Sequence, residues 1–181
     1  MGLGQTLLTI MSLMMMGSLI LSFNTMTFNT GLAKDLAEYR IAAASEAISI
    51  LERAEGLAFD EYSYTRDLTS LDSLSTSLGR DSGEDSTNQL TFDDVDDYYG
   101  FRDTIQVNGI PYKVETTVEY DTLNRVAGTI DKCPPGTRSW FKKITVYVTG
   151  PHLLNFSKQD EKGPIPDTVK LERLVGFWSF Q

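Results

Sequence analysis

The densest group of side chains that could do chemistry lies in FDDVDDYYGF, residues 92–101. Four carboxylates fall within five positions of this segment, on Asp93, Asp94, Asp96 and Asp97. They repel one another unless water, backbone amides or a cation compensates them. Calcium is the cation that such oxygen ligands suit, although the spacing of an EF-hand loop is absent. The segment therefore predicts either a calcium site or a loop whose aspartates cap backbone amides.

The other reactive residues are isolated. His152 is the only histidine and follows Pro151, with no serine or cysteine motif that would make it a general base. Cys133 is the only cysteine, which excludes an internal disulfide and favours a buried thiol over a cross-link between chains. Nucleophile-elbow, phosphate-loop and HExxH motifs are absent. We therefore predict that the chain is not an enzyme and binds no cofactor other than calcium.

The chain is acidic, with 181 residues and a net charge of −9. Nucleic-acid binding relies on clustered Lys and Arg, which this sequence does not show, so we predict no nucleic-acid contact. The length leaves room for one modest domain beyond the N-terminal segment.

The N-terminal segment has no charged side chain before Lys34. About 20 apolar residues are enough to cross a hydrocarbon core of roughly 30 Å, so residues 1–31 are predicted to be a membrane anchor. A secretory signal peptide is the alternative, but this run is longer and has no basic front. Apolar residues then recur at helical spacing, at Leu36, Ala43, Ala47, Ile50, Ala54 and Leu57.

We therefore predict one helix over residues 1–59, whose amphipathic half, residues 32–59, packs on a sheet. A continuous helix over residues 3–59 would be roughly 85 Å long and would need partners along its length. Asn24–Gly31 is rich in poor helix formers and predicts a weakened helix. The alternative is an intact helix whose Thr and Asn side chains bond back to the preceding turn.

The remainder is predicted to be a surface loop region, residues 60–104, and an antiparallel β-sheet domain, residues 105–181. Alternation over residues 112–120 and 140–149 predicts two strands that each bury one face. Asn108-Gly109 predicts a hairpin before the first strand, and Gly150-Pro151 is predicted to end the second. Residues 169–180 are predicted to form a last strand. The predicted fold class is α+β.

This order of an apolar helix, an amphipathic half and a β-rich domain resembles the type IV pilins and the pseudopilins of type II secretion. FDDVDDYYGF and WFKKITVYVTGP resemble segments of minor pilins and minor pseudopilins. The resemblance implies a membrane anchor that becomes the core of a helical filament after assembly. It also implies passage through the bacterial inner membrane and a pilus assembly machinery as a partner.

The family carries a glutamate at the fifth mature position, where this sequence, counted from Met1, has Gln5. An amide still accepts a hydrogen bond but brings no charge, so capture of a neighbouring terminal amine should be weaker. The other predicted assembly residues are small ones that permit close helix approach, namely Gly2, Gly4, Gly17 and Ser18. In the family, assembly often melts the helix at a place corresponding to Gly17 and Ser18.

Three functions compete at this stage. The preferred one is a structural subunit of an extracellular filament of identical chains, inserted in the inner membrane before assembly. The second is a minor pilin or pseudopilin that primes or caps a filament. The third is a binding domain, or an enzyme, that stays anchored in the membrane.

Overall fold

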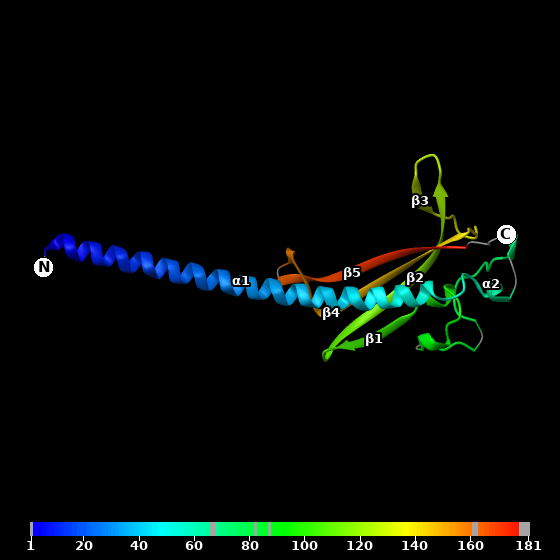
Figure 1. Cartoon of the computed structure of the whole chain (residues 1–181), viewed down its shortest axis with the longest axis horizontal. Coiled ribbons are helices and arrows are strands. Elements are labelled where there is room, and N and C mark those ends of the chain that lie inside the picture. The colour runs from blue at the N-terminus through cyan, green and yellow to red at the C-terminus, as the bar shows by residue number, and fades with distance from the viewer. Residues whose placement is uncertain (1, 66–67, 82, 87, 161–162, 178–181) are drawn as a thin grey trace. The chain divides into compact units, whose positions relative to one another are not determined.

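The computed structural model describes residues 2–65, 68–81, 83–86, 88–160 and 163–177. The chain divides into two compact units, Met1–Tyr39 and Arg40–Gln181. The first unit is the N-terminal part of helix α1, Leu3–Glu55, and the second contains the rest of α1 and an antiparallel sheet (Figure 1). The predicted α+β class, with the helix packed on the sheet, is confirmed.

Helix α1 ends at Glu55, four residues earlier than the predicted Phe59. The last turn closes at a glycine: the Gly56 amide donates to the carbonyls of Glu52 at 3.2 Å and Arg53 at 3.1 Å. Glycine is a common residue just past a helix end.

The helix is continuous through Asn24–Gly31, so the predicted weakening there is wrong. Thr25, Thr27 and Thr30 each donate their hydroxyl to the carbonyl four residues earlier, at 2.8–2.9 Å. These bonds satisfy the hydroxyls inside the helix, so the threonines do not compete with its backbone ladder. Gly17 and Ser18 are also helical, and Ser18 donates to the Met15 carbonyl at 2.8 Å.

The sheet has the strand order β1-β2-β4-β5, and every pairing is antiparallel (Figure 1). A short strand, β3, pairs with the far end of β2. The strand bounds are Arg102–Val107 for β1, Ile110–Asn124 for β2, Thr129–Lys132 for β3, Phe141–Asp160 for β4 and Gly163–Gly176 for β5. Asn108 and Gly109 both have positive φ angles, 53° and 79°, and form the predicted hairpin turn between β1 and β2.

The core lies between one face of the sheet and the second-unit part of α1. The predicted alternation holds, because β2 buries Tyr112, Val114, Thr116, Val118 and Tyr120, and β4 buries Lys142, Ile144, Val146 and Val148. The helix buries Ala43, Ala47, Ile50, Leu51 and Ala54. Three of these five are alanines, whose small side chains allow the helix backbone to lie close to the strands.

Three strand predictions need correction. Strand β4 continues through Gly150-Pro151 to Asp160. Its pairing with β5 shifts register between Thr149 and Leu154, so Pro151, which has no N–H, is not required to donate a hydrogen bond to the neighbouring strand. Strand β5 begins at Gly163, six residues before the predicted start, and ends at Gly176; positions 178–180 of that prediction lie outside the described residues. Strand β3 lies between the two strands predicted from alternation, where no strand was predicted.

The connection between α1 and the sheet contains helix α2, Glu61–Thr65, and three 3-10 turns, at Leu71–Ser73, Gln89–Thr91 and Asp96–Tyr98. The sheet begins inside this predicted loop region, because β1 starts at Arg102. A second hydrophobic cluster fixes the connection to the end of the sheet, through Phe59, Leu68, Leu74, Tyr120 and Cys133.

Candidate assembly surface and acidic loop

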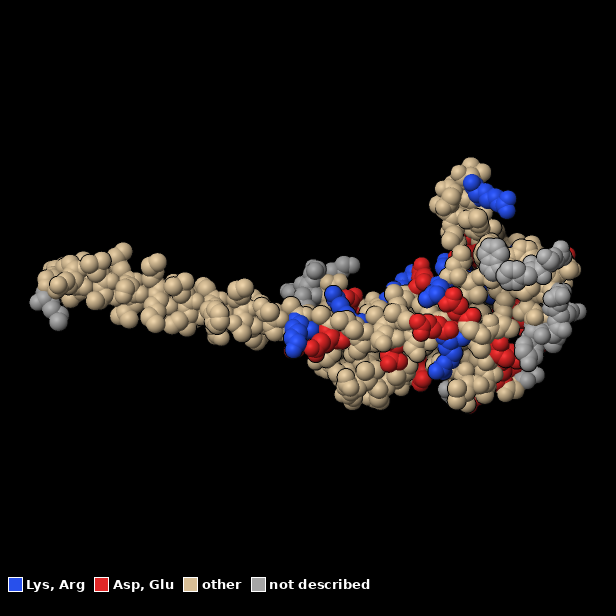
Figure 2. Space-filling model, viewed as in Figure 1, with Lys and Arg blue, Asp and Glu red and all other residues tan. Residues whose placement is uncertain are grey.

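The side chains of residues 3–33 of α1, called here the apolar surface, are exposed within the chain. None of the most apolar 18-residue window of α1 is buried. Leu3, Leu19 and Phe28, for example, are 81%, 65% and 72% exposed. No charged side chain lies on this stretch (Figure 2). Large exposed apolar patches mark contacts with a membrane or with another protein, so this surface is the first candidate site.

Helix α1 is long and apolar enough to cross a membrane, as an anchor or as a signal segment. The predicted membrane insertion is supported to that extent. The threonines of residues 24–31 do not oppose it, because their hydroxyls already have backbone partners within the helix.

The predicted assembly residues do not form one stripe. An added Cβ at Gly2, Gly4 or Gly17 would meet no atom within 4 Å, so each leaves open space at the helix surface. Gly4 and Gly17 are 13 positions apart, which at 3.6 residues per turn places them about 140° apart around the helix. Gln5 and Ser18 are exposed beside them. Close approach at both glycines therefore requires neighbours on opposite sides of the helix.

Three of the four predicted aspartates have one of two roles, and the first, held by Asp94 and Asp97, is to cap their own loop. Asp94 Oδ1 accepts from the Asp96 amide at 2.8 Å and the Asp97 amide at 3.3 Å. Asp97 Oδ2 accepts in return from the Asp93 amide at 3.0 Å and the Asp94 amide at 3.1 Å. This is the capping alternative that the sequence left open.

Aromatic residues anchor the acidic loop from inside. The rings of Phe92 and Tyr98 meet edge to face at 5.1 Å, and Phe92 meets Phe101 in the same way at 5.6 Å. All three rings are buried, together with Val95. Tyr99, the other aromatic residue of the segment, is half exposed. The loop is therefore held in place at both its backbone and its side chains.

The second role belongs to Asp96, which forms a buried ion pair with Lys142 on β4. Lys142 Nζ also contacts Asp60 Oδ1 at 2.9 Å and donates to the Phe59 carbonyl at 2.6 Å. The lysine side chain is fully buried. Its ammonium lies 4.6 Å from the centre of the Phe59 ring and 5.4 Å from that of Tyr120. This group, Lys142 with Asp60, Asp94 and Asp96, is called here the buried lysine site.

Burial changes the acidity of this site. Loss of solvent, with the charges of Asp96 and Asp97 nearby, raises the pKa of Asp94 to about 9, although Lys142 opposes the change. Burial also raises the pKa of Asp96 against the opposing effect of the Lys142 ammonium. A hydrogen bond joins the two carboxyl groups, and it favours the proton on Asp94.

The predicted calcium ligands do not converge on one point. Among the residues that the structure describes, two acidic groups have ligand atoms within 4.8 Å of one another, namely Glu61 with Asp93 and Asp94, and Glu84 with Asp93 and Asp97. Burial and a hydrogen bond to Asp97 raise the pKa of Glu84 to about 7, a sign of crowded carboxyl groups. Asp96 belongs to neither group. Calcium binding stays a prediction, and Asp93, which belongs to both groups, is the residue whose replacement tests it.

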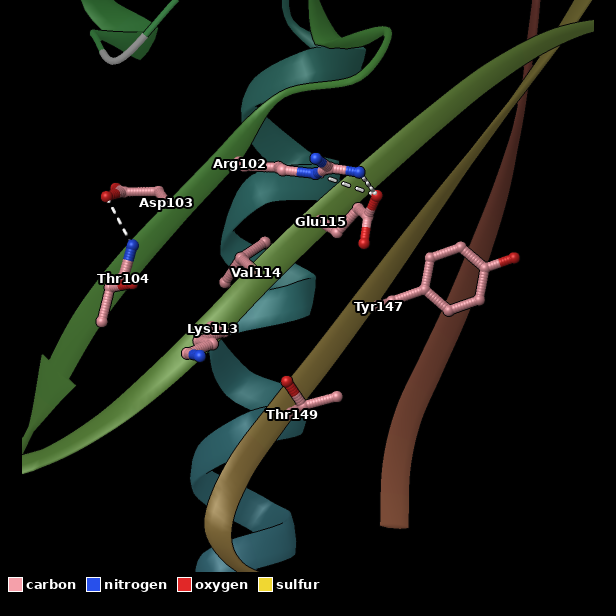
Figure 3. A pocket seen from close by; sticks show the side chains of 8 residues that line it. All are labelled: Arg102, Asp103, Thr104, Lys113, Val114, Glu115, Tyr147 and Thr149. Carbon is pink, nitrogen blue, oxygen red and sulfur yellow. Dashed lines mark hydrogen bonds and ion pairs between the residues drawn. The ribbon is translucent and has the colours of Figure 1, made fainter. Parts of the chain in front are cut away.

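A shallow polar depression lies on the sheet, between residues of β1, β2 and β4 (Figure 3). Arg102 crosses it to Glu115, with Nε 3.0 Å from the carboxylate, and Tyr147 and Thr149 line the opposite side. Both charged groups are satisfied by each other. The residues that line it include no histidine or cysteine.

Sequence reasoning missed Asp60 and Lys142 as members of a site. The signal was present for Lys142, because this charged residue falls in the buried register of an otherwise apolar strand face. Asp60 gave no such signal. Cys133 is buried as expected, and His152 lies exposed on β4, outside the buried lysine site.

Comparison with models of protein families, with curated proteins and with solved structures gave no match. The candidate sites are therefore defined by geometry alone. They are the apolar surface, which is exposed within the chain, and the buried lysine site, which is enclosed by the β-domain.

Proposed function

We propose that this chain is a structural subunit of an extracellular, type IV pilus-like filament that assembles through the apolar surface of α1. The observation that supports the proposal is the exposure of that surface along residues 3–33, on a helix that continues into a folded β-domain. Before assembly the same surface is covered by the inner membrane.

The length of the uncharged run favours assembly over a permanent anchor. The 31 residues from Leu3 to Ala33 extend for about 46 Å as a helix, whereas a bilayer core of roughly 30 Å needs only about 20 residues. The part of the run beyond the length needed to cross a bilayer includes residues 24–31, where threonines and asparagines are interspersed with apolar residues. Such residues suit contacts between helices, where small and hydroxyl side chains are enriched.

Assembly gains little from the hydrophobic effect, because lipid tails are as apolar as the helix itself. Close packing between helices must supply the driving force. Gly4 and Gly17, on opposite sides of α1, would let neighbours approach from two directions, as a central bundle of helices requires. Gln5 would add a hydrogen bond without charge, so its contribution should depend little on pH.

A second candidate function is a minor pilin or pseudopilin that primes or caps a filament. The likeness of FDDVDDYYGF to segments of minor subunits favours it. The two candidates differ in abundance, because a structural subunit is the main protein of sheared filaments and a priming subunit is a trace component.

The filament proposal is tested against simple anchoring by Gly17→Leu. The added side chain stays apolar, so membrane insertion should be kept, but it fills the space in which a neighbouring helix would lie. We expect the variant to remain in the membrane and to yield far fewer filaments in negatively stained, sheared surface material. Met16→Leu, which nearly conserves volume at the adjacent position, is the matched control.

Mass spectrometry of the sheared material identifies its main protein. Wild-type chain recovered only as single detergent-bound molecules, with no filaments in which it is present, would refute the filament proposal. Normal filament yield from Gly17→Leu would refute the packing argument while leaving the filament itself in place.

A further inference from the structure

The buried lysine site brings an amine and a carboxyl group together with water excluded. Lys142 Nζ is in direct contact with Asp96 Oδ1, and both side chains are at most 3% exposed. The aromatic rings of Phe59 and Tyr120 cover the ammonium. A buried ion pair is costly, because each charge has lost its hydration.

The two aspartates that contact Lys142 have different surroundings. Asp60 accepts from the Ser75 amide at 3.2 Å and from the Ser75 hydroxyl at 3.2 Å, and the Tyr120 hydroxyl lies 3.4 Å from it. Its oxygens are therefore occupied by donors. Asp96 instead shares a hydrogen bond with the carboxyl group of Asp94, which holds the proton. Both carboxyl groups accept hydrogen bonds, but the donor to Asp96 is an acid that can transfer its proton, whereas an amide and a hydroxyl donate to Asp60; a transferred proton makes the Asp96 carboxyl group the better electrophile.

We propose that Lys142 and Asp96 condense to form an intramolecular amide bond, which joins strand β4 covalently to the acidic loop. The Lys142 amine is the nucleophile and Cγ of Asp96 is the electrophile. Asp60 is placed to take a proton from the amine, and Asp94 is placed to donate one to the Asp96 carboxyl group. The inference needs the fold of the second unit and does not depend on filament assembly.

The reaction balances without any other reactant. The ammonium gives one proton to Asp60, and the neutral amine attacks Asp96 Cγ while Asp94 protonates a carboxyl oxygen. The Cγ–O bond then breaks as Asp60 passes its proton to the leaving oxygen, which departs as one water molecule, and the second proton of the nitrogen goes to Asp94. In total, one ammonium and one carboxylate become one amide and one water, and Asp60 and Asp94 return to their starting states.

The site also offers hydrogen-bond partners to the amide product. The new amide N–H lies where the ammonium now donates to the Phe59 carbonyl at 2.6 Å, and the amide oxygen keeps the Asp94 carboxyl group as its donor. Condensation replaces two buried charges with one neutral, hydrogen-bonded group. Close contact lowers the entropic part of the barrier, and exclusion of water favours the loss of a water molecule.

The test is the intact mass of the full chain, purified from membranes in detergent and measured after denaturation. We expect the wild-type mass to be lower than the sequence mass by one water molecule. Proteolysis should then give one branched peptide that contains residues 96 and 142. Acylation of amines in denaturant should label Lys143 and leave Lys142 unlabelled.

Two variants assign the loss of water. Lys142→Arg keeps the positive charge but cannot form this bond, so it should show the full sequence mass. Lys143→Arg, at the adjacent position whose lysine pairs with Glu119 and Asp121 on the other face, should keep the loss. Because mass is read in denaturant, poor folding of Lys142→Arg does not obscure its result. A wild-type chain of full mass with Lys142 labelled overturns the proposal, and so does a loss of water that persists in Lys142→Arg, as an aspartyl succinimide would give.

Discussion

Leu19→Arg places a permanent charge near the middle of the uncharged run of α1. Leu19 is 65% exposed within the chain, so the substitution does not disturb the chain's own core. On a membrane-insertion scale a central leucine contributes about −0.6 kcal/mol and a central arginine about +2.5 kcal/mol, a change of about 3 kcal/mol. At 1.4 kcal/mol for each factor of ten, the insertion equilibrium shifts roughly a hundredfold.

The assay separates membranes from sheared surface material and measures the chain in each fraction with an antibody against the β-domain. We expect Leu19→Arg to be extracted from membranes by an alkaline wash and to be missing from filaments, since every copy would bring an unpaired charge into a dry helix bundle. Val126→Arg is the matched control, because Val126 is fully exposed on the hairpin between β2 and β3. Equal amounts of Leu19→Arg and wild-type chain in both fractions would show that this surface is not buried in an apolar environment.

Two further predictions concern the β-domain and are measured by near-UV circular dichroism of the full chain in detergent. Gly150→Ala should lower the free energy of unfolding by about 1–3 kcal/mol, because its Cβ would lie 2.9 Å from the buried Tyr112 ring. Gly31→Ala is the control, because its Cβ meets open space and should not lower the stability of the β-domain. Equal stability of the two variants would contradict the predicted clash. Asp94→Asn should flatten the fall in stability with rising pH. The folded-state pKa of Asp94, about 9, lies above its ordinary 3.8, so the native state binds the extra proton and loses that advantage as pH rises between these values. Asp96, Asp97 and Lys142 also face this carboxyl group. If the dependence of stability on pH is the same in Asp94→Asn and wild type, Asp94 is not the group that causes it.

The elements that sequence reasoning located correctly are those with a local period. The alternation over Tyr112–Tyr120 is visible in any short window, because one face of β2 packs under α1. The end of β4 was misplaced because Gly150-Pro151 also has the composition of a turn. In the structure Gly150 is needed where the Tyr112 ring passes close to the backbone, and Pro151 lies at a shift in register.

The buried lysine site shows what a local pattern cannot supply. Asp60 and Asp96 lie 82 and 46 positions from Lys142, and only the folded sheet brings them together. The acidic segment indicated crowded carboxylates correctly. It could not show that one of the four, Asp96, would also pair with a lysine on another element, because that contact depends on which strand packs against the loop.

The turn between β2 and β3 closes on itself. The Asn124 side chain accepts from the amides of Val126 and Ala127, both at 3.1 Å, and the Gly128 amide returns to the Asn124 carbonyl at 2.8 Å. The shape of the turn is therefore fixed by hydrogen bonds within residues 124–128 and does not depend on contacts with the core. A short epitope or dye-binding tag inserted beside Val126, which is fully exposed, should consequently leave the fold undisturbed and remain accessible to its label.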